Sequence, residues 1–382
     1  MLDEPVRWDD SMNGWVVSTY DLVKEVLRGD DNLCRHMDFD NAEVVSGVIG
    51  NPRHMSFITG DEHRRMHQWW IKLFSPAQAA RYQETVVKPI VTATFDRLVS
   101  RSDIDITADV ATRIPPRVIA AVLGLPWEDD AWIARMVVLL RRVGTFFDRR
   151  PSQGEIEADA TSAAKEVAET LMPFVRERAS GEGDDAISFA WRELPKTLPD
   201  FSETDVIGVV QTMFLGGTDT TARGIANAAY LLLTRPDIAE QVRTDMSLEA
   251  PFVEESLRLL GPSHFRSRRA NKDFEVGGVK IRKDDKVLPV LASADRDPAK
   301  YPQPDALNLH RPAARDHVAF NTGPRMCVGA ALARAEIHEA VHQLLHRVPN
   351  LRINADAPAP EMEGFALRAY TPLHGKFDPV VG

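Results

Sequence analysis

Cysteine is scarce in this sequence of 382 residues, which contains only Cys34 and Cys327. Two cysteines provide neither a disulfide scaffold nor a multi-cysteine metal cluster, which favours a reducing, intracellular compartment. Long apolar runs are also missing, since no stretch reaches the ~18 residues of a membrane span. The first residues, MLDEPVRWDD, lack the basic start and the apolar run of a signal peptide. We therefore expect a soluble, cytoplasmic protein that makes no membrane contact.

Positive charge is in deficit as well. Lys and Arg number 46 against 56 Asp and Glu, which gives a formal net charge of −10. A general nucleic-acid binder would show a basic excess, so we expect no nucleic-acid partner, although a local basic patch is still compatible with these numbers. The hydrophobic fraction of 44% is ordinary for a globular protein and allows a substantial core. Because no repeat or low-complexity linker interrupts the chain, we expect a single domain over residues 1–382 and a monomer.

The apolar periodicity predicts a helix-rich chain with a few short strands. Helices are expected over residues 20–28, 61–74, 76–100, 113–124, 128–147, 155–180, 202–234, 251–260 and 330–346, and strands over 15–19, 274–276, 279–281 and 287–290. We predict Asp61 as a helix N-cap, a bend near Pro89, and a hairpin turn at Gly277-Gly278. Residues 30–60 are expected to form a long loop of the kind that often carries function, and residues 365–370 a hairpin.

The longest predicted helix, residues 202–234, carries the segment GGTDTT (Gly216–Thr221) at its middle. A helix of that length would be ~50 Å long, enough to cross a domain. Two adjacent glycines inside a helix cost roughly 1 kcal/mol each relative to alanine, so the local break requires a reason. One explanation is a glycine bend in which a threonine bonds to its own backbone carbonyls, and the other is a functional kink.

Cys327 lies in the segment FNTGPRMCVG (Phe320–Gly329), directly before a predicted helix. Unpaired N–H groups and the positive end of the helix dipole at that position favour thiolate over thiol. Gly323 and Gly329 flank the cysteine, which lets the backbone turn tightly and a flat ligand approach, and Arg325 adds a cation. For the cysteine taken alone, a buried structural role is the alternative.

The whole segment resembles the haem-ligating loop of the cytochrome P-450 family. That pattern is Phe, two residues, Gly, one residue, Arg or His, one residue, Cys, one residue, Gly. Every fixed position is filled, by Phe320, Gly323, Arg325, Cys327 and Gly329. The resemblance runs from about Pro5 to the C-terminus, and the family's usual first helix is therefore expected to be missing or truncated.

Two further segments, in the expected order, support the resemblance. Glu255 and Arg258 match the family's Glu-x-x-Arg, a buried structural pair behind the haem loop, whereas alone they would be an ordinary pair on one helix face. The GGTDTT segment is similar to the family's oxygen-activating kink. There the missing Cβ atoms of Gly216 and Gly217 would leave room for dioxygen against the helix.

A third segment, His63-Arg64-Arg65-Met66-His67, places two histidines on one helix face. A zinc protease needs Glu directly after the first histidine, and Arg64 stands there, so we reject that site. The family shows His-x-x-x-Arg here, both contacting a haem propionate. His63 matches, but His67 replaces the arginine and supplies no fixed charge, so propionate binding is expected to be weaker or pH-dependent. Arg268 fits another propionate-binding position of the family.

The resemblance implies a mainly α fold with small β-sheets, in which haem b lies between the long central helix and the Cys-loop helix. It implies cofactor contacts from His63, His67, Gly216, Gly217, Arg268, Phe320, Gly323, Arg325 and Gly329, with Cys327 as the iron ligand. Thr220 and Asp219 would be catalytic and deliver protons to bound oxygen. The implied reaction inserts one oxygen atom from O2 into a small hydrophobic organic substrate, with His264 and Arg266 either as anchors for an acid group or directed to solvent or to the haem. By resemblance, the substrate pocket draws on residues 44–58, 142–147, 213–214, 263–266 and 365–367.

Electrons would come from a separate ferredoxin-type donor with its NAD(P)H reductase. We predict a basic patch for that donor from Arg64, Arg65, Lys72 and Arg334, with ordinary solvated charges as the alternative. Two other functions stay open: the same haem–thiolate fold used as a peroxygenase or non-oxidative haem enzyme, and a non-catalytic haem-binding, gas-sensing or interaction protein. The intact Asp-Thr pair argues against a peroxide user, and no output region of a sensor is visible.

Overall fold

The computed structural model describes residues 3–29, 33–34, 53–55, 58–147, 156–312 and 314–379. The α-helices are α1 Tyr20–Arg28, α3 Gly60–Leu73, α4 Pro76–Tyr82, α5 Lys88–Asp96, α6 Ile114–Val122, α7 Asp130–Phe147, α8 Glu157–Glu177, α9 Ala186–Glu193, α10 Glu203–Gly217, α11 Asp219–Thr234, α12 Pro236–Thr244, α13 Glu249–Leu260, α14 Leu291–Ala294 and α15 Ala330–Arg347. Shorter turns are the π-helical η1 Gln83–Val87 and η2 Ile106–Ala111 and the 3-10 segments η3 Leu194–Lys196, η4 Met246–Leu248, η5 Ala314–Asp316 and η6 Gly323–Arg325. The strands are β1 Val6–Asp9, β2 Gly14–Val17, β3 Leu33–Cys34, β4 Asp103–Asp105, β5 Arg268–Ala270, β6 Phe274–Val276, β7 Val279–Ile281, β8 Lys286–Pro289, β9 Arg352–Ile353, β10 Glu361–Glu363, β11 Ala369–Thr371 and β12 His374–Lys376.

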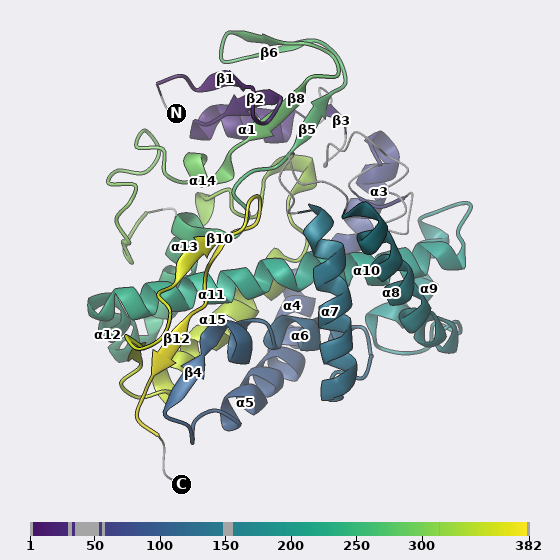
Figure 1. The fold of residues 1–382 in the computed structure, drawn as a ribbon. Helices are drawn as coiled ribbons and strands as arrows, with labels where there is room; N and C mark the ends of the chain where they lie inside the picture. The colour runs from purple at the N-terminus through teal and green to yellow at the C-terminus, as the bar shows by residue number, and fades with distance from the viewer. Residues whose placement is uncertain are drawn as a thin grey trace.

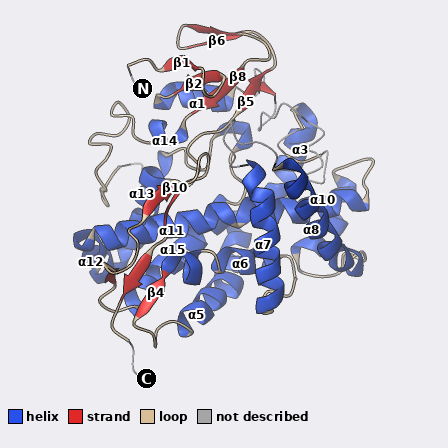
Figure 2. Ribbon diagram, viewed as in Figure 1, coloured by secondary structure: helices blue, strands red, loops and turns tan. Residues whose placement is uncertain are grey.

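Helices dominate the described chain, and the strands gather in small sheets toward its edges (Figures 1 and 2). The largest sheet has the order β1-β2-β8-β5-β3, so it combines the N-terminal strands with strands from the C-terminal half. A second sheet, β4-β12-β9, joins the end of the chain to the segment after α5. This arrangement confirms the expected mainly α fold with small sheets. Within the described residues, no helix has the length and apolar character needed to cross a membrane.

The predicted long helix of residues 202–234 is two helices, α10 and α11, which meet at Thr218. Its start is a capping box, because Ser202 and Asp205 each accept the other's backbone N–H through their side chains. At the break, the Thr218 hydroxyl donates to the Phe214 carbonyl at 2.7 Å. Helix α11 then crosses the middle of the molecule (Figure 1). The break expected at the glycines therefore falls one residue after them.

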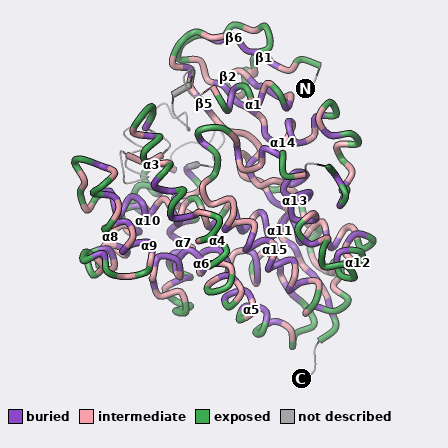
Figure 3. The backbone as a smooth tube through the Cα atoms, turned by 180° about the vertical axis from the view of Figure 1, so that it is seen from behind, coloured by how far each residue is buried: buried purple, intermediate pink, exposed green. Residues whose placement is uncertain are grey.

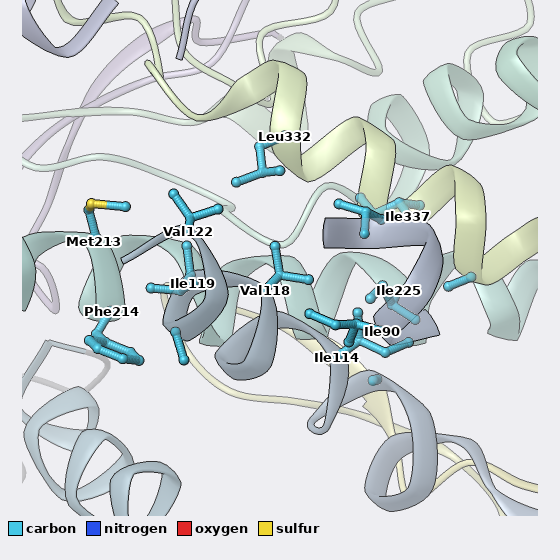
Figure 4. Packing of buried hydrophobic residues seen from close by; sticks show 14 of the residues in the cluster. Ile90, Ile114, Val118, Ile119, Val122, Met213, Phe214, Ile225, Leu332 and Ile337 are labelled. Carbon is cyan, nitrogen blue, oxygen red and sulfur yellow. The ribbon is translucent and has the colours of Figure 1, made fainter. Parts of the chain in front are cut away.

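The core is built around the contact of α11 with α15 and α6. Apolar side chains from the three helices interdigitate, among them Ile225, Ile337 and Val118 (Figure 4). A Cβ atom at Gly224 would lie 2.9 Å from Ile337 Cδ1, so α11 and α15 approach each other closely at this glycine. The buried residues follow these helices through the centre, and the exposed residues lie on the outer turns (Figure 3). The core thus holds α15, which begins directly after Gly329, in a defined position.

Several local expectations need correction. Thr59, not Asp61, occupies the N-cap of α3, and Asp61 lies in the first helical turn, where its charge still favours the helix dipole. The bend expected near Pro89 is a π-helical turn, η1, directly before α5. The hairpin expected at residues 365–370 is present but has wider bounds, because β10 and β11 pair antiparallel from Glu361 to Thr371, and Leu367 in the connecting loop bridges to Ser263. These features depend on contacts between distant segments, which local spacing does not encode.

The Glu255–Arg258 pair is fully buried, as expected. Arg258 Nε donates to Glu255 Oε1 at 2.7 Å, and both side chains are 0% exposed. Glu255 also accepts from Arg311 Nε at 3.0 Å and from the Asn308 backbone N–H at 3.0 Å. Burial acts to raise the pKa of Glu255, but the hydrogen bonds and the Arg258 charge outweigh it and hold this pKa below its usual range. The carboxylate therefore anchors the coil after residue 295 to α13.

We expect Glu255→Gln to lower the free energy of unfolding by about 3–5 kcal/mol, because it leaves buried arginine charge without its counter-ion. Urea unfolding followed by circular dichroism measures this change. Glu240→Gln is the matched control, since Glu240 makes a similar pair with Arg243 on an exposed helix face, and its unfolding midpoint should stay that of wild type. Equal stability of Glu255→Gln and wild type would contradict the anchoring role.

Candidate active site

The Cys327 loop is held by its own backbone. The Cys327 N–H donates to the Phe320 carbonyl at 2.9 Å, which closes residues 320–327 into a tight turn. Gly323 has φ +72°, and a Cβ atom there would lie 3.0 Å from the Arg28 Cα atom of α1. Glycine is thus required twice at this position, by the backbone conformation and by the packing against α1. The loop then passes through Gly329, the N-cap of α15.

Cys327 is exposed, as are Gly323, Pro324 and Met326 of its loop, whereas Asn321 and Arg325 are buried. Burial raises the pKa of the Cys327 thiol, while a hydrogen bond from the Gly329 backbone and the charges of Arg266 and Arg334 act in the opposite direction. The lowered pKa expected from the helix start is therefore wrong for the protein alone, because loss of solvation outweighs the dipole. The loop nevertheless directs backbone N–H and positive charge toward the sulfur, which suits a thiolate bound to a metal.

The kink between α10 and α11 leaves an open helix face. Gly216 is exposed in the middle of a buried helix pair, and a Cβ atom there would meet nothing within 4 Å. Gly217 instead faces the core, where its Cβ would lie 2.5 Å from Ile119 Cδ1. The Thr220 hydroxyl donates to the Gly216 carbonyl at 2.7 Å. The threonine bond that explains the segment structurally is present, and the kink also leaves the helix surface at Gly216 uncovered.

Asp219 is half-exposed and is held by Arg223, whose Nε lies 2.9 Å from Asp219 Oδ2. Arg223 Nη1 in turn donates to the Leu367 carbonyl at 2.7 Å. The acid beside the kink therefore keeps contact with solvent while its orientation is fixed from the C-terminal segment.

Helix α3 brings both sequence-predicted histidines to the Cys327 loop. His63 is 1% exposed, and its ring centre lies 5.7 Å from that of His67. His67 Nε2 is 3.0 Å from the Met326 carbonyl oxygen, so this histidine touches the loop itself. Arg325 is also fixed, because it donates to the carbonyls of Met55 at 2.9 Å and Ile58 at 3.1 Å. Met55, Ile58, helix α3 and the Cys327 loop thus lie together on one side of the site.

Two arginines approach the site from the 266–268 segment. Arg268 opens β5, is 2% exposed and donates to the Ser267 carbonyl at 3.1 Å. Arg266, two residues earlier, is buried deeply enough that desolvation lowers its pKa, and its charge acts on Cys327. The sequence left Arg266 open among a substrate anchor, a group facing the haem and a solvated charge. Arg266 precedes β5 and is not part of that strand, so its separation of only two residues from Arg268 was the signal that the two lie close.

The predicted basic patch is altered at one of its members. Arg334 donates to Glu254 at 2.7 Å and lies over the Phe320 ring, with 4.5 Å to the ring centre. Arg64, Arg65 and Lys72 are exposed on α3, and Arg64 forms a surface ion pair with Asp61. The exposed positive charge of the expected patch therefore lies on α3, whereas Arg334 is mostly covered and paired.

Comparison with known proteins gives the family of this chain. A family model described as Cytochrome P450 matches residues 8–372. The chain belongs to the cytochrome P450 family. Cytochrome P450 CYP105Q4 of Mycobacterium marinum is 30% identical over 354 residues, which cover 91% of this chain and 82% of that protein. The 20-oxo-5-O-mycaminosyltylactone 23-monooxygenase of Streptomyces fradiae is 27% identical over 380 residues, covering 98% and 86%.

Solved structures show the same fold. The structure of P450BioI in complex with an acyl carrier protein ligated to hexadec-9Z-enoic acid superposes with a TM-score of 0.89 at 23% identity, and covers 99% of this chain and 96% of that one. CalO2 gives a TM-score of 0.87 at 27% identity, covering 98% and 93%. This P450 is accordingly an oxidoreductase of the monooxygenase family, whose cofactor is haem b.

The residues present fit such a flat group. The Cys327 sulfur, a soft donor suited to iron, belongs to an exposed residue. A Cβ atom at Gly329 or at Gly216 would meet nothing within 4 Å, so open space lies over both the loop and the kink. His63 adds buried ring nitrogens and Arg266 a half-buried guanidinium, both of the kind that can bond a carboxylate. This P450 therefore combines a thiol, open glycine faces and carboxylate-binding groups.

The two glycines of the kink are expected to respond oppositely to alanine. Gly216→Ala adds a methyl to open space and improves helix propensity, so the free energy of unfolding should rise by up to about 1 kcal/mol. Gly217→Ala forces a methyl against Ile119 and should lower it by about 1–3 kcal/mol. Urea unfolding of both variants tests this contrast. Equal shifts in the two variants would mean that the open face at Gly216 is filled.

Proposed function

We propose that this P450 is a haem–thiolate monooxygenase with Cys327 as the iron ligand, acting on a small hydrophobic organic substrate. The observation that carries the proposal is the exposed thiol of Cys327 in a loop pinned by the Phe320 carbonyl and by Gly323. Bound haem supplies an iron that activates dioxygen, and a thiolate ligand adds electron density that favours cleavage of the O–O bond. The Gly329 N–H bond to the sulfur would tune that ligand.

The carboxylates of the haem would be held by His63, His67, Arg268 and Arg325. His63 and Arg268 are almost fully buried, where a charged hydrogen bond is strongest. His67 and Arg325 both touch backbone carbonyls on this side of the site, which orients their side chains. With histidine where relatives carry arginine, this side of the site would hold less fixed positive charge.

Protons would be handled by Thr220 and Asp219. The Thr220 hydroxyl carries its proton on Oγ1 inside the kink, beside the open face at Gly216. Asp219, at the start of α11, is half-exposed and can exchange protons with water. Arg223 would position the Asp219 carboxylate without removing it from solvent. Thr220 and Asp219 would thus provide a proton source, with the Thr220 hydroxyl at the kink and the Asp219 carboxylate in contact with water.

The electron donor would be a separate ferredoxin-type protein with an NAD(P)H reductase. Arg65 and Lys72, both exposed on α3, support this part of the proposal. The same helix contacts the Cys327 loop through His67, so an acidic partner on this face would lie on the sulfur side of the site.

The substrate pocket proposed here differs from the expected one in the roles of Phe214 and His264. Phe214 is 0% exposed and packs against Trp132, with 6.3 Å between ring centres, so it belongs to the core. Burial, with the charges of Arg368 and Arg296, lowers the pKa of His264 to about 4. A neutral His264 can offer a hydrogen bond but no charge at neutral pH, which favours a largely apolar substrate. The proposed loop of residues 44–58 lies mostly outside the described residues.

The reduced, carbon-monoxide difference spectrum tests the iron ligand. Wild type is expected to show the strongly red-shifted Soret band of a thiolate-ligated haem, and Cys327→His is expected to lose it because an imidazole replaces the sulfur. Cys34→Ser, which changes the other cysteine, should keep the band. A histidine-type band in wild type, or a red-shifted band that survives in Cys327→His, would overturn this assignment.

Coupling of product to NAD(P)H tests Thr220. Thr220→Ala is expected to keep haem and substrate binding but to divert electrons to peroxide, because the kink loses its hydroxyl proton. Thr212→Ala is the matched control, since Thr212 makes the same bond to a carbonyl four residues back, Gly208, on α10. If peroxide formation is equal in the two variants, the hydroxyl of Thr220 has only a structural role.

A further inference from the structure

Three histidines converge on one carboxylate at the far end of α15. His338, His342 and His346 stand four residues apart, so they share one face of the helix. Glu249, the first residue of α13, meets that face with a side chain that is only 2% exposed. The site is distinct from the proposed haem site, because His346 lies 16 residues along α15 from Ala330, or about 24 Å.

The atoms are arranged in two sets around the two oxygens of Glu249. Oε1 lies 3.0 Å from both His342 Nδ1 and His346 Nε2. Oε2 lies 3.3 Å from both His338 Nε2 and His342 Nδ1. One ligand atom from each of Glu249, His342 and His346 lies within 4.8 Å of the others. One carboxylate oxygen and two imidazole nitrogens thus form a compact triangle, and the second oxygen faces His338 and His342.

This triangle has the dimensions of a zinc site. Ligand atoms about 2.0–2.2 Å from a tetrahedral zinc ion lie about 3.4 Å apart, so small side-chain rotations would convert the observed 3.0 Å contacts into ligation. Two imidazoles and one carboxylate are a common donor set for zinc, with water as the fourth ligand. The nearby cation Arg347 does not compete, because its guanidinium donates to Asp96 Oδ1 at 2.6 Å.

We propose that Glu249, His342 and His346 bind one zinc ion, with His338 as a positioning residue that donates to the free oxygen of Glu249. A metal-bound carboxylate is regularly oriented by such an outer hydrogen bond. The histidines are about one-third exposed, so an ion can enter from solvent. Bound zinc would clamp the start of α13 to the end of α15 and stabilise the folded protein by mass action.

The test uses the full, haem-loaded chain prepared without a polyhistidine tag and dialysed against a chelator. Zinc sulfate is titrated by calorimetry, bound zinc is counted by elemental analysis, and the thermal midpoint is recorded with and without zinc. One zinc per chain and a raised midpoint are expected. His346→Asn and His342→Ala should weaken binding by more than tenfold, and His338→Ala by about tenfold, because it removes only the orienting bond.

His310→Ala is the matched control, since His310 is exposed and lies outside the cluster. It should leave zinc affinity and the thermal shift unchanged. The proposal fails if folded wild type binds zinc no more tightly than His346→Asn, or if His310→Ala weakens binding as much as the cluster variants do. Haem content, read from the Soret band of each variant, verifies that folding is intact.

Discussion

The buried carboxylate of Glu255 is the interaction on which the Cys327 loop depends. It binds Arg258 on its own helix and Arg311 and the Asn308 N–H in the following coil. Arg258 then donates to the carbonyls of residues 295, 304 and 306. A proline-rich coil without regular structure cannot satisfy these carbonyls itself, so the two arginines replace the missing ladder of backbone bonds.

The same network reaches the loop through Asp295. Its side chain accepts the Val318 N–H at 2.7 Å, two residues before Phe320. Burial raises the pKa of Asp295 to about 7, against the lowering effects of His317 and the Val318 bond. Because this folded-state pKa lies above the ordinary value, the group favours the folded protein at lower pH, and this contribution is lost as pH rises toward 7. The Cys327 loop is therefore held in place by the buried network of Glu255, Arg258 and Asp295.

Local patterns predicted much of this structure, and long-range contacts account for the rest. Helix α1, the strands β6 and β7 and the start of α15 follow directly from apolar spacing and glycine positions. The five fixed positions of the loop likewise need only short-range sequence. By contrast, the partner of Arg334 is Glu254, 80 residues away, and that of His342 is Glu249, 93 residues away. Three histidines spaced four residues apart, His338, His342 and His346, are visible in the sequence. Nothing local indicates Glu249, the carboxylate that they contact.

Helices α13 and α15 run in opposite directions and are joined by two carboxylates of α13. Glu254, in the middle of α13, pairs with Arg334 near the start of α15, while Glu249, at the beginning of α13, meets His342 and His346 near the end. Burial opposes ionisation of Glu254, but His317 and Arg334 lower its pKa to about 2. A lowered pKa stabilises the fold above the ordinary carboxyl range and is lost only as pH falls toward 2. The end of α15 nearest Cys327 is therefore anchored by a permanent charge pair. Its far end is held by imidazoles that contact Glu249 and, as we propose, by a metal ion between them. Because the start of α15 is fixed, the Cys327 loop that precedes it is held in place. The contact between Glu249 and the histidines lies at the opposite end of α15, where movement would displace the Cys327 sulfur least.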